Sequence, residues 1–260
     1  LAGSGTTTAG VCIGRNERMF IPKGETVTAP GPDGRPHTYR WDESLFWNVY
    51  YVKGAFLDAD KAFEVINGMR TVELRIINKC INTLVLARAR ARHPAINVRC
   101  SAVEGNENFE LRERLMFLGL PAPLFTLDFE TELGASIGRD SFQRFFDCLE
   151  PAFGLQVSLG QVNTVVLCPA LTSHSELSGE ALRQAGISPT TIRVSVGEED
   201  PRTLLAQLMR AAELTLEPVC GGFLSHFPAP DELDRLYEST YVDVHRRYAA
   251  SRPRMARLME

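Results

Sequence analysis

The sequence predicts an α+β fold with a mostly antiparallel sheet, and three observations support this prediction. Apolar side chains recur at three- and four-residue spacing over residues 71–92, which is typical of a long amphipathic helix. Short β-prone and helix-like segments then alternate over residues 97–213. Within that run, Asp200 is a favoured N-cap and Pro201 a favoured first-turn residue, so a further helix is expected there.

The individual elements follow from local patterns. Residues 9–13 and 19–21 are β-prone, whereas prolines and glycines predict an exposed loop over residues 22–36. The chain is helix-like from Asp42, and the long helix should end before Pro94 because the residue preceding a proline avoids the α region. Further strands are predicted over residues 97–100, 124–129, 154–158, 164–167 and 191–196. Further helices are predicted over residues 140–149, 179–185 and 200–213.

Size and composition limit the class of protein. A chain of 260 residues with 44% hydrophobic residues can bury a substantial core without disulfides or metals. The net charge of −4 disfavours nucleic acid and anionic membrane surfaces as partners. The six cysteines form no C-x-x-C pair and are expected to be reduced, mostly buried thiols. No apolar run is long enough to span a membrane and no secretory leader is recognised, so we expect a cytoplasmic protein.

The character of the chain changes after Leu214. Prolines and glycines interrupt residues 218–230, and a helix is predicted from Asp231 into an arginine-rich segment. Such a cluster can bind phosphate or nucleic acid. Acidic residues interspersed along the helix favour a solvated tail or a helix at an oligomer contact instead.

Common catalytic motifs are missing from the sequence. There is no P-loop, no H-E-x-x-H, no G-x-S-x-G and no His/Cys group at metal-ligand spacing. The five histidines lie far apart, and none is a catalytic candidate. The Gly3-Ser4-Gly5 segment is expected to form a turn, although the backbone N–H groups of such a loop can also bind an anion.

Arg193 is the local feature that stands out. In an alternating strand, Arg193 and Ser195 share one face while Ile192, Val194 and Val196 share the other. The guanidinium group therefore faces either water or an enclosed anion, and the pattern leaves both possibilities open. A guanidinium fork is suited to binding a carboxylate through two parallel hydrogen bonds.

Several segments in order resemble one known family. They are residues 157–160 (Val-Ser-Leu-Gly), 164–170, 173–175, 185–188 and 192–200. Residues 68–75 are similar to the start of a G-L-x-T-L-x-L-R helix, and residues 3–11 to a G-H-G-T-T-I-G-G-V segment. On these motifs the chain is identified as a member of the Cys/Met-metabolism pyridoxal-phosphate enzymes, which include cystathionine γ-synthase, methionine γ-lyase and O-acetylhomoserine sulfhydrylase.

The resemblance implies an α/β fold of the aspartate-aminotransferase-like type I pyridoxal-phosphate class. Residues 1–70 would complete the large cofactor-binding domain and its connecting loop, and residues 71–92 would be the long interdomain helix. Residues 93–213 would form the C-terminal small domain with a mostly antiparallel sheet, and residues 214–260 an extra tail. The Schiff-base lysine of the family would lie two residues before Leu1, so we expect no catalytic residue within this fragment.

The resemblance also implies a substrate site. Arg193 matches the arginine that binds the substrate α-carboxylate, and Ser158 matches a serine near the substrate. Leu159 would contribute main-chain contacts. Asn163 stands where cystathionine-type members often carry glutamate, which puts cystathionine in doubt as a substrate or product. No cofactor-binding residue and no metal ligand is assigned.

The expected function is pyridoxal 5'-phosphate-dependent γ-replacement or γ-elimination on an amino acid with a γ-leaving group. The opening Gly-Thr-Thr segment leans towards the sulfhydrylase branch, whereas Asn163, the loop at residues 22–41 and the tail lean towards specialised biosynthesis. The alternative is a lysine-free, non-catalytic partner subunit or pseudo-enzyme of the same fold. The expected partners are an amino-acid substrate and further copies of the chain in a dimer or tetramer with shared active sites.

Overall fold

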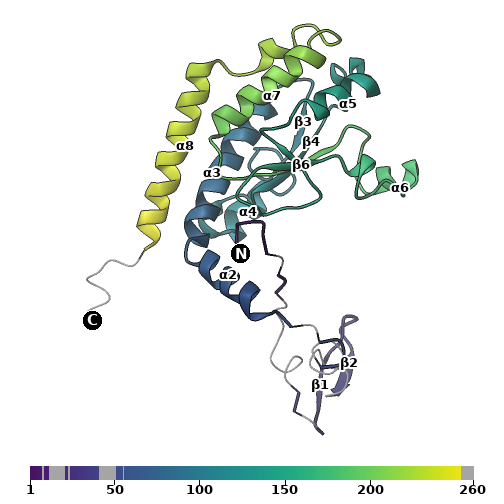
Figure 1. Ribbon diagram of the computed structural model, residues 1–260, viewed down its shortest axis with the longest axis vertical. Coiled ribbons are helices and arrows are strands. Elements are labelled where there is room, and N and C mark those ends of the chain that lie inside the picture. The colour runs from purple at the N-terminus through teal and green to yellow at the C-terminus, as the bar shows by residue number, and fades with distance from the viewer. Residues whose placement is uncertain (8, 12–20, 23, 41–50, 55, 253–260) are drawn as a thin grey trace. The chain divides into compact units, whose positions relative to one another are not determined.

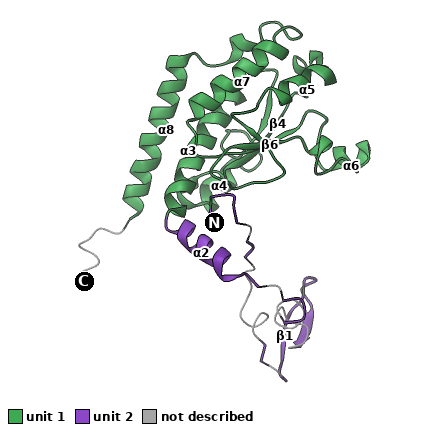
Figure 2. Cartoon of the chain, in the orientation of Figure 1, with its two compact units in different colours: residues 1, 3, 71–260 green, residues 2, 4–70 purple. Residues whose placement is uncertain are grey.

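The computed structural model describes residues 1–7, 9–11, 21–22, 24–40, 51–54 and 56–252. The chain divides into two compact units (Figure 2). Unit 1 comprises Leu1, Gly3 and residues 71–260, and unit 2 comprises Ala2 and residues 4–70. The assignment of these residues to the domains of a larger enzyme stays a prediction.

Unit 2 contains a hairpin and a helix. Strands β1 (Thr26–Pro30) and β2 (Pro36–Arg40) pair antiparallel (Figure 1). The interpretation of residues 22–36 as a loop is therefore wrong for β1. Its one proline, Pro30, ends the strand, where no central hydrogen-bond ladder is interrupted. Helix α2 (Ala59–Met69) begins at Asp58, whose side chain accepts a hydrogen bond from the Lys61 backbone at 2.9 Å.

Two predictions in unit 2 fall mainly outside the described residues. Residues 9–11 are not a strand, while residues 12–20 are not described, so the expected pair of short strands is not tested. The helix expected from Asp42 lies largely in residues 41–50, which are also outside the description.

The sheet of unit 1 is built from β3 (Asn97–Arg99), β4 (Leu124–Asp128), β5 (Gly154–Leu155), β6 (Val165–Leu167) and β7 (Ile192–Ser195). The strand order is β3-β4-β7-β6-β5, and the pairs are antiparallel except for β5 with β6. This confirms the predicted mostly antiparallel sheet. β7 is the central strand, although it is the last of the five in sequence.

The helices of unit 1 are α3 (Val72–Ala91), α4 (Phe109–Leu115), α5 (Arg139–Asp147), α6 (Gly179–Gln184), α7 (Pro201–Thr215) and α8 (Pro230–Ser251). Short 3₁₀ segments lie at Phe117–Gly119 (η3), Gly134–Ser136 (η4), Pro169–Leu171 (η5) and Phe223–His226 (η6). The predicted helices are confirmed to within a few residues, whereas α4 was not predicted. Among the described helices, none is long and apolar enough to cross a membrane.

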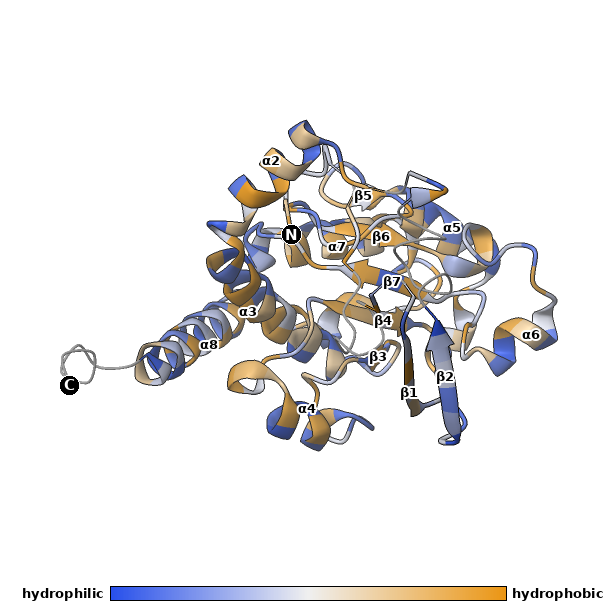
Figure 3. Cartoon of the chain, turned by 90° about the horizontal axis from the view of Figure 1, so that it is seen from below, coloured by the Kyte–Doolittle hydropathy of each residue, from blue (hydrophilic) through white to orange (hydrophobic). Residues whose placement is uncertain are grey.

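The core of unit 1 lies between the sheet and the helices α3, α5 and α7. Ile81, Val85 and Leu205 are completely buried in it. Figure 3 shows that the central strands are mainly hydrophobic, whereas α8 is largely hydrophilic. The described cysteines are free thiols, of which Cys80, Cys100, Cys168 and Cys220 are buried and Cys148 is partly exposed, as expected for reduced core residues.

Helix α8 packs alongside α3 of the same chain (Figure 1). Leu233, Thr240 and Val244 recur at helical spacing and are buried, and they form the contact face. Arg247 pairs with Asp243 and also donates to the Leu118 carbonyl at 2.7 Å. The interpretation of this segment as a solvated tail is therefore wrong for residues 230–251, because its narrow apolar stripe finds a partner within unit 1.

His93 lies just after the C-terminal end of α3, at a site that suits a neutral imidazole ring. Its Nε2 donates to the Phe223 carbonyl at 2.8 Å while its Nδ1 accepts from the Ala95 N–H at 3.1 Å, and the side chain is 2% exposed. Burial lowers the pKa of His93, and the nearby His226 acts in the same direction, although the hydrogen bond to Phe223 opposes them. A proton on Nδ1 would face the Ala95 N–H group, so the neutral ring fits this site.

His93 should make the protein less stable in mild acid. Because its pKa is lower in the folded state than in the unfolded state, the unfolded chain binds more protons once the pH falls below about 6.5. The free energy of unfolding should therefore fall between pH 7.5 and pH 5.5, and His93→Gln should reduce this fall. Urea unfolding at both pH values measures it. The exposed His174→Gln is the control, and an equal fall in both variants would contradict the assignment.

Candidate substrate-binding site around Arg193

Arg193 lies on the central strand of unit 1. It pairs with Thr126 of β4 on one side and with Leu167 of β6 on the other. Ile192, Val194 and Val196 are buried against the core. The predicted alternation is confirmed, since Arg193 and Ser195 contact the same loop from the opposite face.

The guanidinium group of Arg193 is half-buried and only partly satisfied. Its Nη2 donates to the carbonyl of Ser158 at 2.6 Å, whereas its Nε is buried without a hydrogen bond in the described part of the chain. Burial lowers the pKa of Arg193. An unpaired buried donor costs about 1–3 kcal/mol, and the remainder of the half-buried group is the part that an anion could contact. The enclosed anion, one of the two possibilities left open by the sequence, stays a prediction.

The loop that Arg193 contacts comprises residues 158–161, named here the 158–161 loop. The Ser195 hydroxyl accepts a hydrogen bond from the Gly160 N–H at 3.0 Å. Within the loop, Gln161 Nε2 donates to the Ser158 hydroxyl at 3.0 Å. The main chain of Leu159 thus lies between two contacts to β7, while its side chain is 58% exposed. The structure brings Ser158, Leu159 and Arg193 together.

A polar face of α3 holds the same region from the other side. Lys79 Nζ donates to the carbonyls of Gly160, at 3.2 Å, and of Gln161. Asn82 Nδ2 donates to the carbonyls of Gly197 at 3.1 Å and Glu199 at 2.8 Å. Both side chains are 1% exposed. Burial lowers the pKa of Lys79, an effect that attraction to Glu198 partly offsets.

Sequence reasoning missed these residues of α3. It identified the apolar stripe of the helix but not the polar side chains of the other face. Asparagine is a poor helix former, so Asn78 and Asn82 on either side of a lysine inside a helix were the available signal. Asn78 Nδ2 donates to the Glu198 carbonyl at 3.3 Å, in line with the same supporting role.

Asn163 lies at the entry to β6, where two backbone segments approach closely. Its side chain is exposed, and its backbone adjoins Gly197. The buried Thr164 donates its hydroxyl proton to Glu199 at 2.8 Å, accepts from the Gly197 N–H at 2.9 Å, and donates its backbone N–H to Glu199 at 2.7 Å. Residues 163–164 and 197–199 therefore form one hydrogen-bonded unit beneath the candidate site.

Gly197→Ala should separate these two segments. A methyl group at Gly197 would clash with the Asn163 carbonyl carbon, the Thr164 nitrogen and the Glu199 carboxylate. We expect a loss of about 2 kcal/mol in the free energy of unfolding and a fall of about 5 °C in melting temperature. Differential scanning calorimetry measures both. Gly221→Ala, where nothing lies within 4 Å of the added methyl group, is the control and should be nearly neutral. Equal effects would contradict the close approach.

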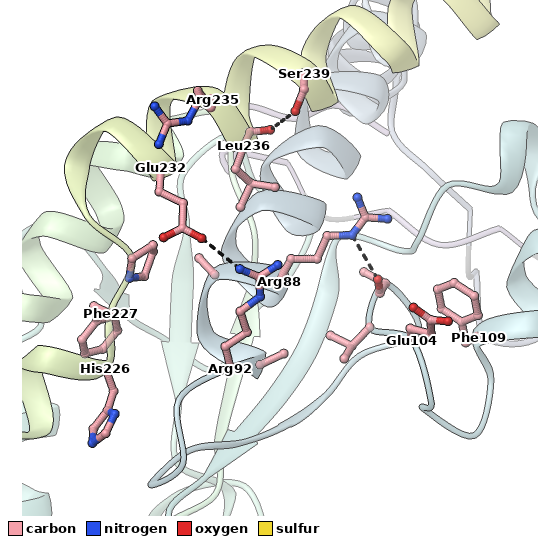
Figure 4. Close-up of a pocket in the computed structure, with 15 residues that line it drawn as sticks. Arg88, Arg92, Glu104, Phe109, His226, Phe227, Glu232, Arg235, Leu236 and Ser239 are labelled. Carbon is pink, nitrogen blue, oxygen red and sulfur yellow. Dashed lines mark hydrogen bonds and ion pairs between the residues drawn. The ribbon is translucent and has the colours of Figure 1, made fainter.

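A separate cavity of about 760 Å³ opens beside the C-terminal half of α3 (Figure 4). Arg88 of α3, Arg92 immediately after that helix and Arg235 of α8 supply cationic groups to the cavity. Arg92 is paired with Glu232 at 2.9 Å, and Arg88 Nε donates to the Ala102 carbonyl at 3.4 Å. Its lining includes no residue of β7 or of the 158–161 loop. It is therefore distinct from the candidate site.

The remaining sequence candidates lie apart from these contacts. Residues 173–175 are exposed, and the Ser173 hydroxyl is 2.8 Å from His174 Nδ1. Gly3 and Gly5 have positive φ angles of 86° and 77°, as the expected turn requires. In the described part of the chain, no group of His, Cys, Asp and Glu could hold a metal ion.

Comparison with known proteins identifies the family. Residues 1–213 match the family model described as "Cys/Met metabolism PLP-dependent enzyme". The chain is 27% identical to L-methionine gamma-lyase of Fusobacterium nucleatum over 175 residues, which are 66% of this chain and 42% of that protein. It is 26% identical to homocysteine synthase of Schizosaccharomyces pombe over 232 residues, which are 82% of this chain and 51% of that protein.

Solved structures agree with the family model. Cystathionine gamma-lyase of Micromonospora echinospora is 29% identical, with a TM-score of 0.56 over 63% of this chain and 41% of that chain. The O-acetylhomoserine (thiol)-lyase of Campylobacter jejuni, whose structure contains N'-pyridoxyl-lysine-5'-monophosphate, is 26% identical, with a TM-score of 0.59 over 72% and 44%. The chain thus spans about two fifths to one half of the length of these relatives.

These comparisons identify the fold as that of the pyridoxal-phosphate-dependent enzymes related to cystathionine gamma-lyase. The chain belongs to the Cys/Met metabolism PLP-dependent enzyme family. The cofactor of this family is pyridoxal phosphate, and its members are enzymes of amino-acid metabolism. The family match ends at residue 213, so α8 lies beyond it.

Proposed function

We propose that this chain forms the substrate-carboxylate side of a pyridoxal-phosphate-dependent enzyme that performs γ-replacement or γ-elimination on an amino acid with a γ-leaving group. The observation that carries the proposal is Arg193, whose half-buried guanidinium group is anchored through Nη2 on the Ser158 carbonyl. The relatives named methionine gamma-lyase and homocysteine synthase support this reaction class. Asn163 and the residues beyond 213 favour a specialised biosynthetic substitution.

The described residues offer a binding group for the substrate, but they do not identify the contacts of the cofactor. The half-buried guanidinium group of Arg193 suits a carboxylate, whereas no described residue is assigned to the phosphate or the ring of pyridoxal phosphate. When bound, that group supplies an electron sink for carbanion formation. The contribution of this chain is orientation: Arg193 holds the carboxylate, Ser158 holds Arg193, and the torsion about the substrate Cα is thereby restricted.

The second candidate is a non-catalytic partner subunit or pseudo-enzyme of the same fold. Lys79 is the one lysine in residues 71–260. Its amine is occupied by the carbonyls of Gly160 and Gln161 and is buried, so it is not placed as a Schiff-base lysine.

Borohydride trapping separates the two candidates. The protein is expressed from its full coding sequence, its absorption spectrum is recorded, and intact mass is measured before and after reduction. A long-wavelength pyridoxal band and a reduced adduct, located on a lysine by peptide mapping, support the enzyme. Absence of both the band and the adduct supports the non-catalytic partner.

We also propose that the protein is cytoplasmic and assembles as a homo-oligomer with shared active sites. Reduced core cysteines are consistent with that compartment. Light scattering of the expressed protein gives its mass in solution. A dimer or tetramer is expected, and a monomer would contradict the assembly.

A further inference from the structure

The 158–161 loop has little apolar packing to fix its conformation. Val157, immediately before it, is 66% exposed, and Leu159 within it is 58% exposed. Gly160 has a φ angle of 81°, in the left-handed region that glycine adopts without strain. The position of the loop therefore depends on its hydrogen bonds.

Those hydrogen bonds come from two elements that meet at the loop. Arg193 and Ser195 of β7 contact the Ser158 carbonyl and the Gly160 N–H. From α3, Lys79 reaches the carbonyls of Gly160 and Gln161. The backbone of Gly160 is therefore held at two groups, its N–H by β7 and its carbonyl by α3.

We propose that Lys79 is a positioning residue, which holds the 158–161 loop so that the Ser158 carbonyl orients Arg193 for a substrate carboxylate. This inference rests on the proposed function for its substrate, but the contact of Lys79 with the loop does not. Lys79 touches neither Arg193 nor Ser158 in the described contacts and acts through the backbone of Gly160 and Gln161.

A role in stability alone would not explain a lysine here. A buried ammonium group loses its hydration, and well-packed apolar residues at such positions are often as stabilising or more so. The Lys79 side chain is 1% exposed, and its Nζ donates to carbonyl oxygens rather than to a carboxylate. The ammonium group supplies several donors to converging carbonyls, which an apolar side chain cannot do.

The first test measures the loop directly, without turnover. Hydrogen–deuterium exchange is followed by mass spectrometry in a peptide spanning residues 156–163, using the protein from its full coding sequence. Lys79→Met should raise exchange in this peptide about tenfold or more, because charge-assisted contacts are lost. Lys61→Met is the matched control, since Lys61 is an exposed lysine of α2 paired with Asp58. It should leave exchange in the loop unchanged.

The second test measures substrate binding. Affinity for L-methionine, determined by calorimetry, should fall about tenfold in Lys79→Met. In turnover with O-acetyl-L-homoserine, KM should rise more than kcat falls. Lys79→Gln, which keeps one amide donor, should lie between wild type and Lys79→Met. The melting temperature of Lys79→Met should be unchanged or higher, so that binding and stability move in opposite directions.

The outcomes separate the two hypotheses. Unchanged exchange in Lys79→Met overturns the inference, as does raised exchange with unchanged affinity. The inference is also overturned if Lys79→Met lowers the melting temperature enough to account for the lost affinity and Lys79→Gln does not restore part of that affinity. If wild type binds neither amino acid, the proposed function fails, and the exchange experiment still decides whether Lys79 holds the loop.

Discussion

Replacement of Arg193 by alanine is expected to lower kcat/KM for the amino-acid substrate by about 10²-fold or more. The Nη2 of Arg193 is fixed on the Ser158 carbonyl, so the half-buried guanidinium group is oriented before the substrate arrives. Alanine removes the charge, the donors and the orientation of the carboxylate. Steady-state kinetics of the protein from its full coding sequence measure the loss.

Two further variants sharpen this prediction. Arg193→Lys keeps the charge but not the planar fork, so it should recover only part of the lost kcat/KM. Arg183→Ala removes an exposed arginine of α6 that pairs with Glu180, and it should leave kcat/KM unchanged. Near-normal turnover in Arg193→Ala would contradict the assigned site.

Replacement of Arg90 by methionine is expected to stabilise the fold. Arg90 is completely buried, and its three side-chain nitrogens lack hydrogen-bond partners in the described part of the chain. Its guanidinium carbon lies 5.8 Å from the centre of the Phe125 ring. A space of about 10 Å³ beside it is lined by apolar side chains of the core. Such a space holds about one water molecule at most.

The pKa indicates the size of the effect. Burial lowers the pKa of Arg90 to about 10, which corresponds to about 3 kcal/mol against the charged form in the folded state. Methionine has a similar length and no charge, so the free energy of unfolding should rise by up to about 3 kcal/mol and the melting temperature by about 5 °C or more. Calorimetry at pH 7 measures this.

Arg92→Met provides the matched comparison. Arg92 lies two residues further along the chain, at the C-cap of α3, is exposed, and is paired with Glu232 at the surface. Its replacement should change stability by less than about 1 kcal/mol. A lower melting temperature in Arg90→Met would show that the core guanidinium is satisfied by an interaction other than those described.

The elements that the sequence predicted well carry strong local signals. The helix over residues 71–92 has an unbroken apolar period, and α3 occupies Val72–Ala91. Asp200 does cap α7, accepting from the Arg202 N–H at 2.9 Å. Arg193 was found because a lone charge in an apolar strand conflicts with its neighbours, and the resemblance then supplied a role that the geometry supports.

The features that were missed depend on contacts between distant segments. Nothing local shows that Lys79 lies under residues 160–161, because those residues come from a loop some eighty positions away. The docking of α8 on α3 was missed because its apolar stripe is narrow and its other faces are highly charged. The hairpin of β1 and β2 was obscured by prolines, which two-stranded ribbons tolerate at their ends.

The central place of β7 makes the Arg193 region depend on pairings between segments that are distant in the sequence. β7 is flanked by β4 and β6, which both precede it in the chain, so each of its two pairings closes a loop. The 158–161 loop then contacts β7 through Arg193 and Ser195. The orientation of Arg193 therefore requires the paired sheet, and chains that stop before β7 lack the site entirely.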